Sequence, residues 1–265
     1  MLDFYASRPA PLDQADGLRR LFAGPRIGHV ALVANARVPF AGVLLERLTA
    51  AFTALGRRTL VVDAADTSPA PHELSRLDLG ACVEALSPEV SYLAARGLPL
   101  RHVDTRGSAA RLLDALAHAA PRADVIVVHA GAGDLARLFM RRPVRPVLMA
   151  ADHPASVTDA YASLKRLALR HGLMSFDLLL AVSASSPRRE RIAPQLAGCA
   201  DRFLGAALHD WAAVDPAGDP AEAPDAALLR VARALLEPVD DRPHAPVPVH
   251  ATLATPTPAH APAWN

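Results

Sequence analysis

Residues 29–56 have the sequence HVALVANARVPFAGVLLERLTAAFTALG, which combines an apolar run, a short loop and an amphipathic stretch. The first seven residues are short, apolar and rich in valine, which predicts a buried strand. From residue 43 the apolar residues return at helical spacing as far as Gly56, which predicts a helix that ends at this glycine. A strand followed directly by a helix is the repeating unit of α/β folds.

The same unit recurs along the chain. Further buried strands are predicted at 58–66, 124–133, 146–152 and 176–183, with a shorter strand at 205–211. Helices are predicted at 13–22, 72–77, 89–96, 108–119, 134–141, 156–172, 187–204 and 225–237, with Asp13 and Ser156 as N-caps. This alternation predicts an α/β fold, doubly wound, with a mainly parallel sheet and helices on both faces.

Composition divides the chain into three regions. Residues 1–25 form a Pro-containing leader and a short amphipathic helix, and residues 26–237 carry the α/β pattern. Residues 238–265 are rich in Pro, His and Ala, and because they offer little that could form a core we expect a disordered tail.

The overall charge and the apolar pattern exclude several classes of protein. A formal net charge of +1 argues against a general nucleic-acid binder. The N-terminus has no secretory pattern, and no apolar run reaches the roughly 20 residues needed to span a bilayer. We therefore expect a cytoplasmic protein. Cys82 and Cys199 lie in Ala/Leu-rich surroundings and are predicted to be buried apolar side chains rather than a disulfide or a metal site.

The loop after the first strand lacks the chemistry of a phosphate site. In doubly wound folds ligands bind at the carboxyl ends of the strands, and this junction is the usual phosphate cradle. A working cradle needs glycines, a lysine for the phosphate charge and a Ser or Thr for magnesium. Residues 35–42, NARVPFAG, contain one glycine, no lysine and no hydroxyl. The only lysine, Lys165, falls on a distant helix, and Arg37 is either an anion contact or a solvated loop residue.

Candidate metal ligands are also few. Asp63 ends the second strand and Asp66 lies just beyond it, whereas His129 ends the third strand, where an acidic residue is usual. No other His, Cys or carboxylate stands at metal-ligand spacing with His129, so we predict a hydrogen-bonded structural histidine and no metal site.

Three stretches carry a family resemblance that covers roughly residues 12–237. They are DQADGLR at 13–19, the strand and the following segment at 58–78, and the long segment 146–183 with CADRFLG at 199–205. On these stretches the chain resembles the MinD/ParA branch of P-loop ATPases, and within it the flagellar number regulators FlhG/FleN. Ala65 departs from the second aspartate of the family's DAD-type segment.

The first of these stretches implies a partner. It is similar to the family's DQAxxLR motif, whose helix docks on the flagellar signal-recognition-type GTPase FlhF and stimulates its GTP hydrolysis. The resemblance implies that Gln14 reaches toward that active site while Leu18 and Arg19 hold the helix in place. Asp13 and Ala15 complete the motif.

The same resemblance implies a degenerate nucleotide site. Alignment with the family's KGGxGKT loop places Ala36 at the signature lysine, Ala41 at the cradle lysine and Gly42 at the magnesium threonine. His129 stands for the Walker B aspartate and Ala181 for the asparagine near the adenine. Loss of these groups should remove most of the stabilisation of phosphoryl transfer. The resemblance thus implies a pseudo-ATPase regulator of flagellar assembly or number that needs no cofactor.

Two other functions stay open. One is an active MinD-like ATPase that binds ATP and magnesium in an unusual site and uses Arg37 for phosphate charge. The other is a cell-division or chromosome-positioning adaptor. Gene neighbourhood would separate the adaptor from the flagellar regulator, because the fold alone does not.

The resemblance also bears on assembly and location. Family members form ATP-sandwiched dimers and dock on membranes through a C-terminal amphipathic helix, a place that residues 225–237 occupy here. With only Arg230 and Arg233 as basic residues, this helix is weakly suited to lipid, so we predict that it packs on the domain, with peripheral membrane contact as the alternative. We expect a monomer or a nucleotide-independent dimer, further flagellar proteins as partners, and the cell pole or the inner-membrane periphery as further locations.

Overall fold

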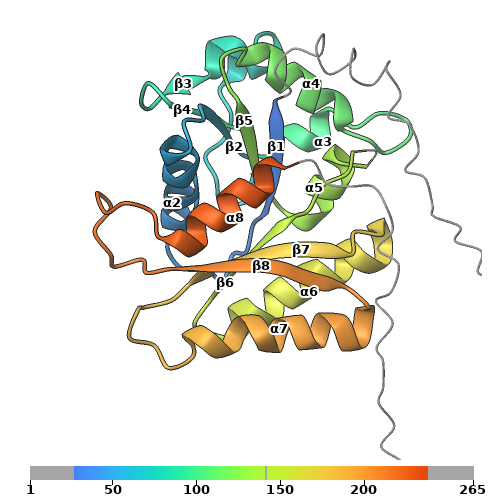
Figure 1. Ribbon diagram of the computed structural model, residues 1–265. Coiled ribbons are helices and arrows are strands. Elements are labelled where there is room, and N and C mark those ends of the chain that lie inside the picture. The colour runs from blue at the N-terminus through green and yellow to red at the C-terminus, as the bar shows by residue number, and fades with distance from the viewer. Residues whose placement is uncertain (1–26, 141, 238–265) are drawn as a thin grey trace, which may run out of the picture.

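Eight strands form one sheet in the computed structural model, which describes residues 27–140 and 142–237 (Figure 1). The strands are β1 (Gly28–Val33), β2 (Thr59–Asp63), β3 (Glu84–Ala85), β4 (Val90–Ala94), β5 (Val125–Ala130), β6 (Val147–Ala151), β7 (Ser175–Ala181) and β8 (Ala207–Val214). Their order across the sheet is β3-β4-β2-β5-β1-β6-β7-β8. Only β3 runs antiparallel to its neighbour, so the prediction of a mainly parallel, doubly wound α/β sheet is confirmed.

Helices cover both faces of this sheet. They are α2 (Ala41–Ala54), α3 (Leu98–Arg101), α4 (Ala110–Ala119), α5 (Ala132–Leu138), α6 (Pro154–His171), α7 (Arg189–Leu204) and α8 (Ala226–Leu236), with the short 3-10 helices η1 (Glu73–Arg76) and η2 (Gly80–Cys82). Strand residues alternate between two cores: Val30 and Leu32 of β1 pack in the cluster under α2 and α8, and Ala31 and Val33 in the cluster under α4 to α7.

The structure corrects several of the predicted elements. Residues 89–96, predicted to be helical, contain the strand β4, which pairs in parallel with β2. Val90, Tyr92 and the alternating pattern around them suit a strand, and the free side of β2 supplies the hydrogen bonds. Only a short 3-10 helix forms in 72–77, and the last strand is longer than predicted.

The start of α6 also differs from the prediction. The helix begins at Pro154, with His153 and not Ser156 at the N-cap position, because proline is favoured in the first turn of a helix. Ser156 is fully buried instead, and its hydroxyl accepts a hydrogen bond from the Ala151 N–H at 2.8 Å. Of the two cysteines predicted to be buried, Cys199 is exposed and Cys82 is half-buried.

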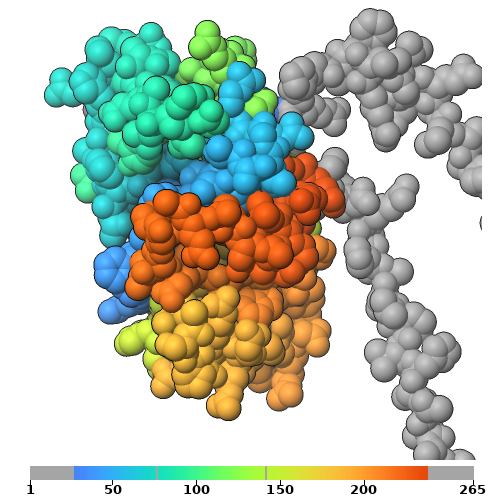
Figure 2. All heavy atoms as spheres, turned by 60° about the vertical axis from the view of Figure 1, so that its left-hand side comes forward, coloured from blue at the N-terminus to red at the C-terminus, as the bar shows by residue number. Residues whose placement is uncertain are grey.

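The last helix packs on the domain, as predicted. Asp225 caps it by accepting a hydrogen bond from the Leu228 N–H at 2.7 Å, and Leu228, Val231 and Ala232 are buried against the sheet and α2. Figure 2 shows this segment in orange, lying across the middle of the face in view. The apolar side that would enter a lipid surface is therefore used within the domain. None of the helices in the described part of the chain is long and apolar enough to cross a membrane.

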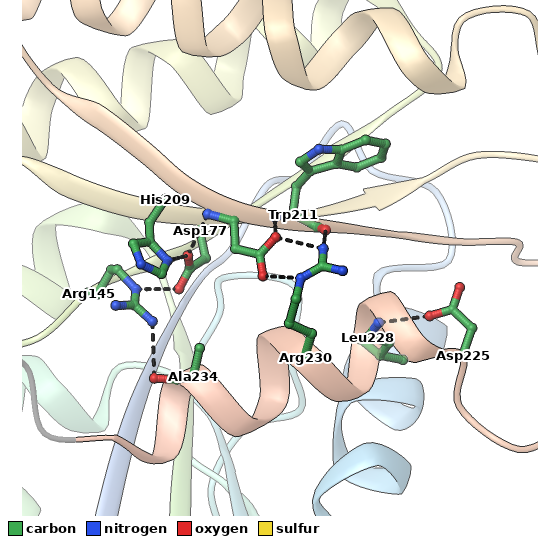
Figure 3. Close-up of polar contacts among 9 residues, drawn as sticks. Arg145, Asp177, His209, Trp211, Asp225, Leu228, Arg230 and Ala234 are labelled. Carbon is green, nitrogen blue, oxygen red and sulfur yellow. Dashed lines mark hydrogen bonds and ion pairs between the residues drawn. The ribbon is translucent and has the colours of Figure 1, made fainter.

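Two ion pairs hold α8 in place (Figure 3). Arg230 makes hydrogen bonds to both carboxylate oxygens of Asp210 at 2.8 Å. Arg145 donates to the fully buried Asp177 at 2.6 Å and to the carbonyl of Ala234 at 3.1 Å. Burial raises the pKa of Asp177, although the neighbouring Arg145 opposes the shift. The charged form of Asp177 thus depends on Arg145.

The substitution Arg145→Met tests this dependence. Because it leaves a buried carboxylate without its cation, it should lower the free energy of unfolding by about 3–5 kcal/mol at neutral pH. The matched control is Arg230→Met, which removes an arginine of which more than half is exposed and should cost no more than about 1 kcal/mol. Urea unfolding of both variants measures the difference, and equal losses would contradict this role of Arg145.

Candidate functional site

The loop from β1 to α2 is held closed by the buried side chain of Asn35. Its amide donates to the carbonyls of Met149 at 2.8 Å and Ser156 at 2.9 Å. Its side-chain oxygen accepts from the Arg37 N–H, and its backbone carbonyl accepts from the Val38 N–H, both at 3.0 Å. A phosphate cradle works by pointing loop N–H groups at the ligand. Here two of those groups are bonded within the loop itself.

The end of this loop keeps a backbone shape that suits glycine. Phe40 has φ 60° and ψ 34°, and it is the one non-glycine residue in the described part of the chain with positive φ. It stands where the family's KGGxGKT loop has its third glycine. A side chain in this left-handed conformation costs roughly 1–2 kcal/mol. Pro39, just before it, has no N–H to offer a phosphate.

The cavity at this edge of the sheet is small and poor in positive charge. It measures about 120 Å³, whereas pockets for small-molecule ligands usually measure about 300–1,000 Å³. Its lining comprises Ala34, Asn35, Ala36, Ala41, Ala65, Asp66, Thr67, His129 and Gly131. The two alanines at the lysine positions add no charge, and Asp66 would repel a phosphate. This arrangement does not fit a nucleoside triphosphate with its magnesium.

The structure brings only some of the predicted site residues together. Ala36, Ala41, Asp66 and His129 line the cavity. Arg37 does not: its side chain is 67% exposed, and its Nε lies 3.7 Å from a carboxylate oxygen of Asp159 on α6. Gly42 and Ala181 are also absent from the lining, Gly42 in the first turn of α2 and Ala181 at the end of β7. Arg37 therefore gives the ATPase alternative no phosphate-binding charge in this geometry.

Asp63 and His129 form a buried pair beside this cavity. The parallel register places them opposite each other on β2 and β5, with His129 Nδ1 2.8 Å from Asp63 Oδ1. The hydroxyls of Ser68 and Tyr92 also donate to the Asp63 carboxylate. Burial acts to raise the pKa of Asp63, but the hydrogen bonds from His129 and Ser68 outweigh it and lower that pKa. Burial and the Asp63 charge raise the pKa of Tyr92 to about 12.

A magnesium site would need the Asp63 carboxylate, and this carboxylate is already hydrogen-bonded. Asp63 already accepts from three side chains, and His129 Nε2 is buried with no hydrogen-bond partner among the described residues. No group of three or more potential metal ligands occurs within 27–140 and 142–237. Asp63 and His129 could not be predicted as a pair from the sequence, because only the pairing of β2 with β5 brings them into contact.

The N-terminal motif cannot be placed in this geometry. Its residues, Asp13, Gln14, Ala15, Leu18 and Arg19, lie outside the described residues, as do the predicted regions 1–25 and 238–265. Asn35 and Ser68, in contrast, bond to groups of this site, although neither was predicted from the sequence to do so. A small polar residue in a loop after a strand gives no signal of such bonding.

Known proteins are similar to this chain in fold, and one of them is also similar in sequence over part of the chain. No protein-family model matches the chain. The antiactivator FleN of Pseudomonas aeruginosa is 36% identical over 102 residues, which is 38% of this chain and 36% of FleN. The cell division protein MinD of Aquifex aeolicus superposes with a TM-score of 0.52 at 12% identity, over 79% of this chain and 96% of that one. MinD of Pyrococcus horikoshii gives a TM-score of 0.51 at 16% identity over the same shares.

The sheet order, the flanking helices and these superpositions define a protein with the MinD/ParA-type P-loop fold. Over 102 residues the chain is also similar to the antiactivator FleN, which agrees with the resemblance inferred from the sequence. The match spans about a third of the length of FleN.

The strained loop residue gives a direct test of the site's geometry. Phe40→Gly should be more stable than Phe40→Ala by roughly 0.5–1 kcal/mol, because glycine escapes the left-handed penalty but loses more backbone entropy on folding. The alanine variant is the matched control, since it removes the same exposed ring and keeps the Cβ. Chemical unfolding of both variants measures the difference. An alanine variant as stable as the glycine variant would show that the backbone at residue 40 is not left-handed.

Proposed function

We propose that this chain is a non-catalytic regulator of flagellar assembly or number, which acts by protein contact and not by nucleotide hydrolysis. The absence of catalysis in this proposal rests on the closed loop after β1. In this loop Asn35 accepts hydrogen bonds from the N–H groups of Arg37 and Val38. The identity with the antiactivator FleN supports the flagellar part.

The chemistry of the cavity supports a pseudo-ATPase. Phosphoryl transfer depends almost wholly on positioning and on positive charge around the transferred group. The described cavity has no lysine or arginine in its lining, and Asp63 beside it is engaged by His129. We therefore expect no ATP or magnesium as cofactor. With no nucleotide to sandwich between subunits, the chain would be a monomer or a nucleotide-independent dimer.

The proposed partner is the flagellar GTPase FlhF. Residues 13–19 match the DQAxxLR motif at each fixed position and precede the first strand, as in the family. In this proposal Gln14 acts at the active site of FlhF, while Leu18 and Arg19 fix the helix against it. The α/β domain then serves as a carrier and as a surface for other flagellar proteins. Contact occurs in the cytoplasm or at the cell pole, and the buried apolar side of α8 gives no support to membrane docking.

The likeness to MinD does not favour a cell-division or chromosome-positioning adaptor. The two MinD structures are 12% and 16% identical to this chain, a level at which only the fold is shared.

GTP hydrolysis by FlhF tests the proposal. The rate is measured for FlhF alone, with the wild-type chain and with its Gln14→Ala variant. We expect the wild type to accelerate hydrolysis and the variant to return the rate to that of FlhF alone, because the amide side chain acts at the active site. Gln195→Ala, which removes an exposed glutamine on α7, is the matched control and should accelerate hydrolysis as the wild type does.

Two results would count against the proposal. No acceleration by the wild type would remove FlhF as the partner of the motif. Equal acceleration by wild type and Gln14→Ala would show that another part of the chain does the work.

A further inference from the structure

Two adjoining hollows lie at the edge of the sheet opposite the degenerate cavity. One measures about 600 Å³ and lies between the ends of α5 and α6, and the other measures about 430 Å³ and lies beside the start of β1 and the end of α8. They share Phe139, Arg142 and Pro143, so together they form one surface, named here the edge groove. Its apolar lining includes Phe139, Met140, Pro143, Leu173, Leu235 and Leu236.

The N-terminal segment of the chain joins the described structure inside this groove. Residue 26 is followed by Ile27, which itself lines the second hollow. Four residues separate Phe22 from Ile27, and an extended chain covers at most about 3.6 Å per residue, so residue 22 lies within about 18 Å of the groove. Such a short tether gives an effective concentration in the millimolar range.

The segment has the apolar pattern that the groove requires. In the helix predicted at 13–22, Leu18, Leu21 and Phe22 fall at positions i, i+3 and i+4 and form one side. A helix of ten residues is marginal in water and needs an apolar surface to be stable. The groove offers such a surface, and Met140 in its lining is 45% exposed.

The charged residues that line the two hollows favour one orientation of the docked helix. Arg170 and His171 line the hollow farther from Ile27. Burial lowers the pKa of His171, and Arg170, Arg137 and Arg166 lower it further, so positive charge gathers at this end of α6. At the other hollow, Asp114 pairs with Arg142 and Glu237 ends the lining.

A helix of ten residues is about 15 Å long. If its C-terminal end lies near Ile27, its first turn, with Asp13 and Asp16, points toward Arg170 and His171. The two carboxylates are the acidic residues of the segment, and this orientation sets them against the positive charge of Arg170 at the end of α6.

We propose that residues 13–22 dock in the edge groove through Leu18, Leu21 and Phe22, with Asp13 and Asp16 toward the end of α6. While docked, the segment hides the side chains that the proposed function assigns to the contact with FlhF. The docked state is therefore autoinhibited, and this consequence rests on the proposed function. The docking itself does not.

Hydrogen exchange of the full-length protein, read by mass spectrometry, tests the docking. The amides of 13–22 should exchange at least about tenfold more slowly than in an unstructured chain, because a docked fraction of about nine-tenths gives that ratio. Met140→Glu places a charge in the apolar lining and should bring the exchange to the unstructured rate. Leu169→Glu is the matched control, since Leu169 is 65% exposed on α6 and outside the groove, and it should leave the exchange slow.

Three outcomes would overturn the docking. One is fast exchange of 13–22 in the wild type, and another is slow exchange that persists in Met140→Glu. The third is slow exchange of 238–265 that Met140→Glu abolishes, which would assign the groove to the C-terminal segment. Unchanged exchange in the sheet of both variants shows that they fold.

The exchange result is independent of the GTPase result. Slow exchange of 13–22 with no effect on FlhF would keep the docking and reject the proposed function. Stimulation of FlhF with fast exchange would keep the proposed function and reject the docking. If both hold, Met140→Glu should stimulate FlhF at lower concentration than the wild type, because its segment is free.

Discussion

The side-chain amide of Asn35 fixes the shape of the candidate site. It reaches from the end of β1 to the carbonyls of Met149 and Ser156, and its oxygen holds the N–H of Arg37. The Asn35 amide and the two carbonyls are buried, where an unmade hydrogen bond is costly. The loop is therefore held in a closed form by bonds that a phosphate would have to displace. This closed loop, together with the missing lysine, is the basis of our proposal that the chain does not work as an ATPase.

The backbone of the site keeps features that the resemblance to the MinD/ParA branch leads one to expect. Phe40 keeps a conformation that suits the glycine of the family's loop, and Asp63 keeps its place at the end of β2. His129, at the place of the acidic residue, now donates to Asp63. A fold whose core packs on both faces of the sheet keeps these positions whether or not a ligand binds. A MinD/ParA-like arrangement of strands is therefore compatible with a chain that, in our proposal, acts through protein contacts.

Much of the fold followed from local patterns. The buried strands β1, β5, β6 and β7 are apolar runs, and α2 and α8 show clear helical spacing, so each was predicted near its observed place. The strand β4 was missed because its pairing with β2 is not a local property. The absence of a lysine and a hydroxyl from residues 35–42 was visible from residue types alone. The bonds from the Asn35 amide to Met149 and Ser156 and the Asp63–His129 pair were not, since they join residues 66 to 121 positions apart.

Equilibrium dialysis of the full-length protein against labelled ATP with magnesium tests the central claim most directly. The account predicts no saturable binding up to about 1 mM, the upper end of the usual range for enzyme substrates. Saturable binding at micromolar concentrations would contradict it, because the closed loop would then have to open and the ATPase alternative would stand.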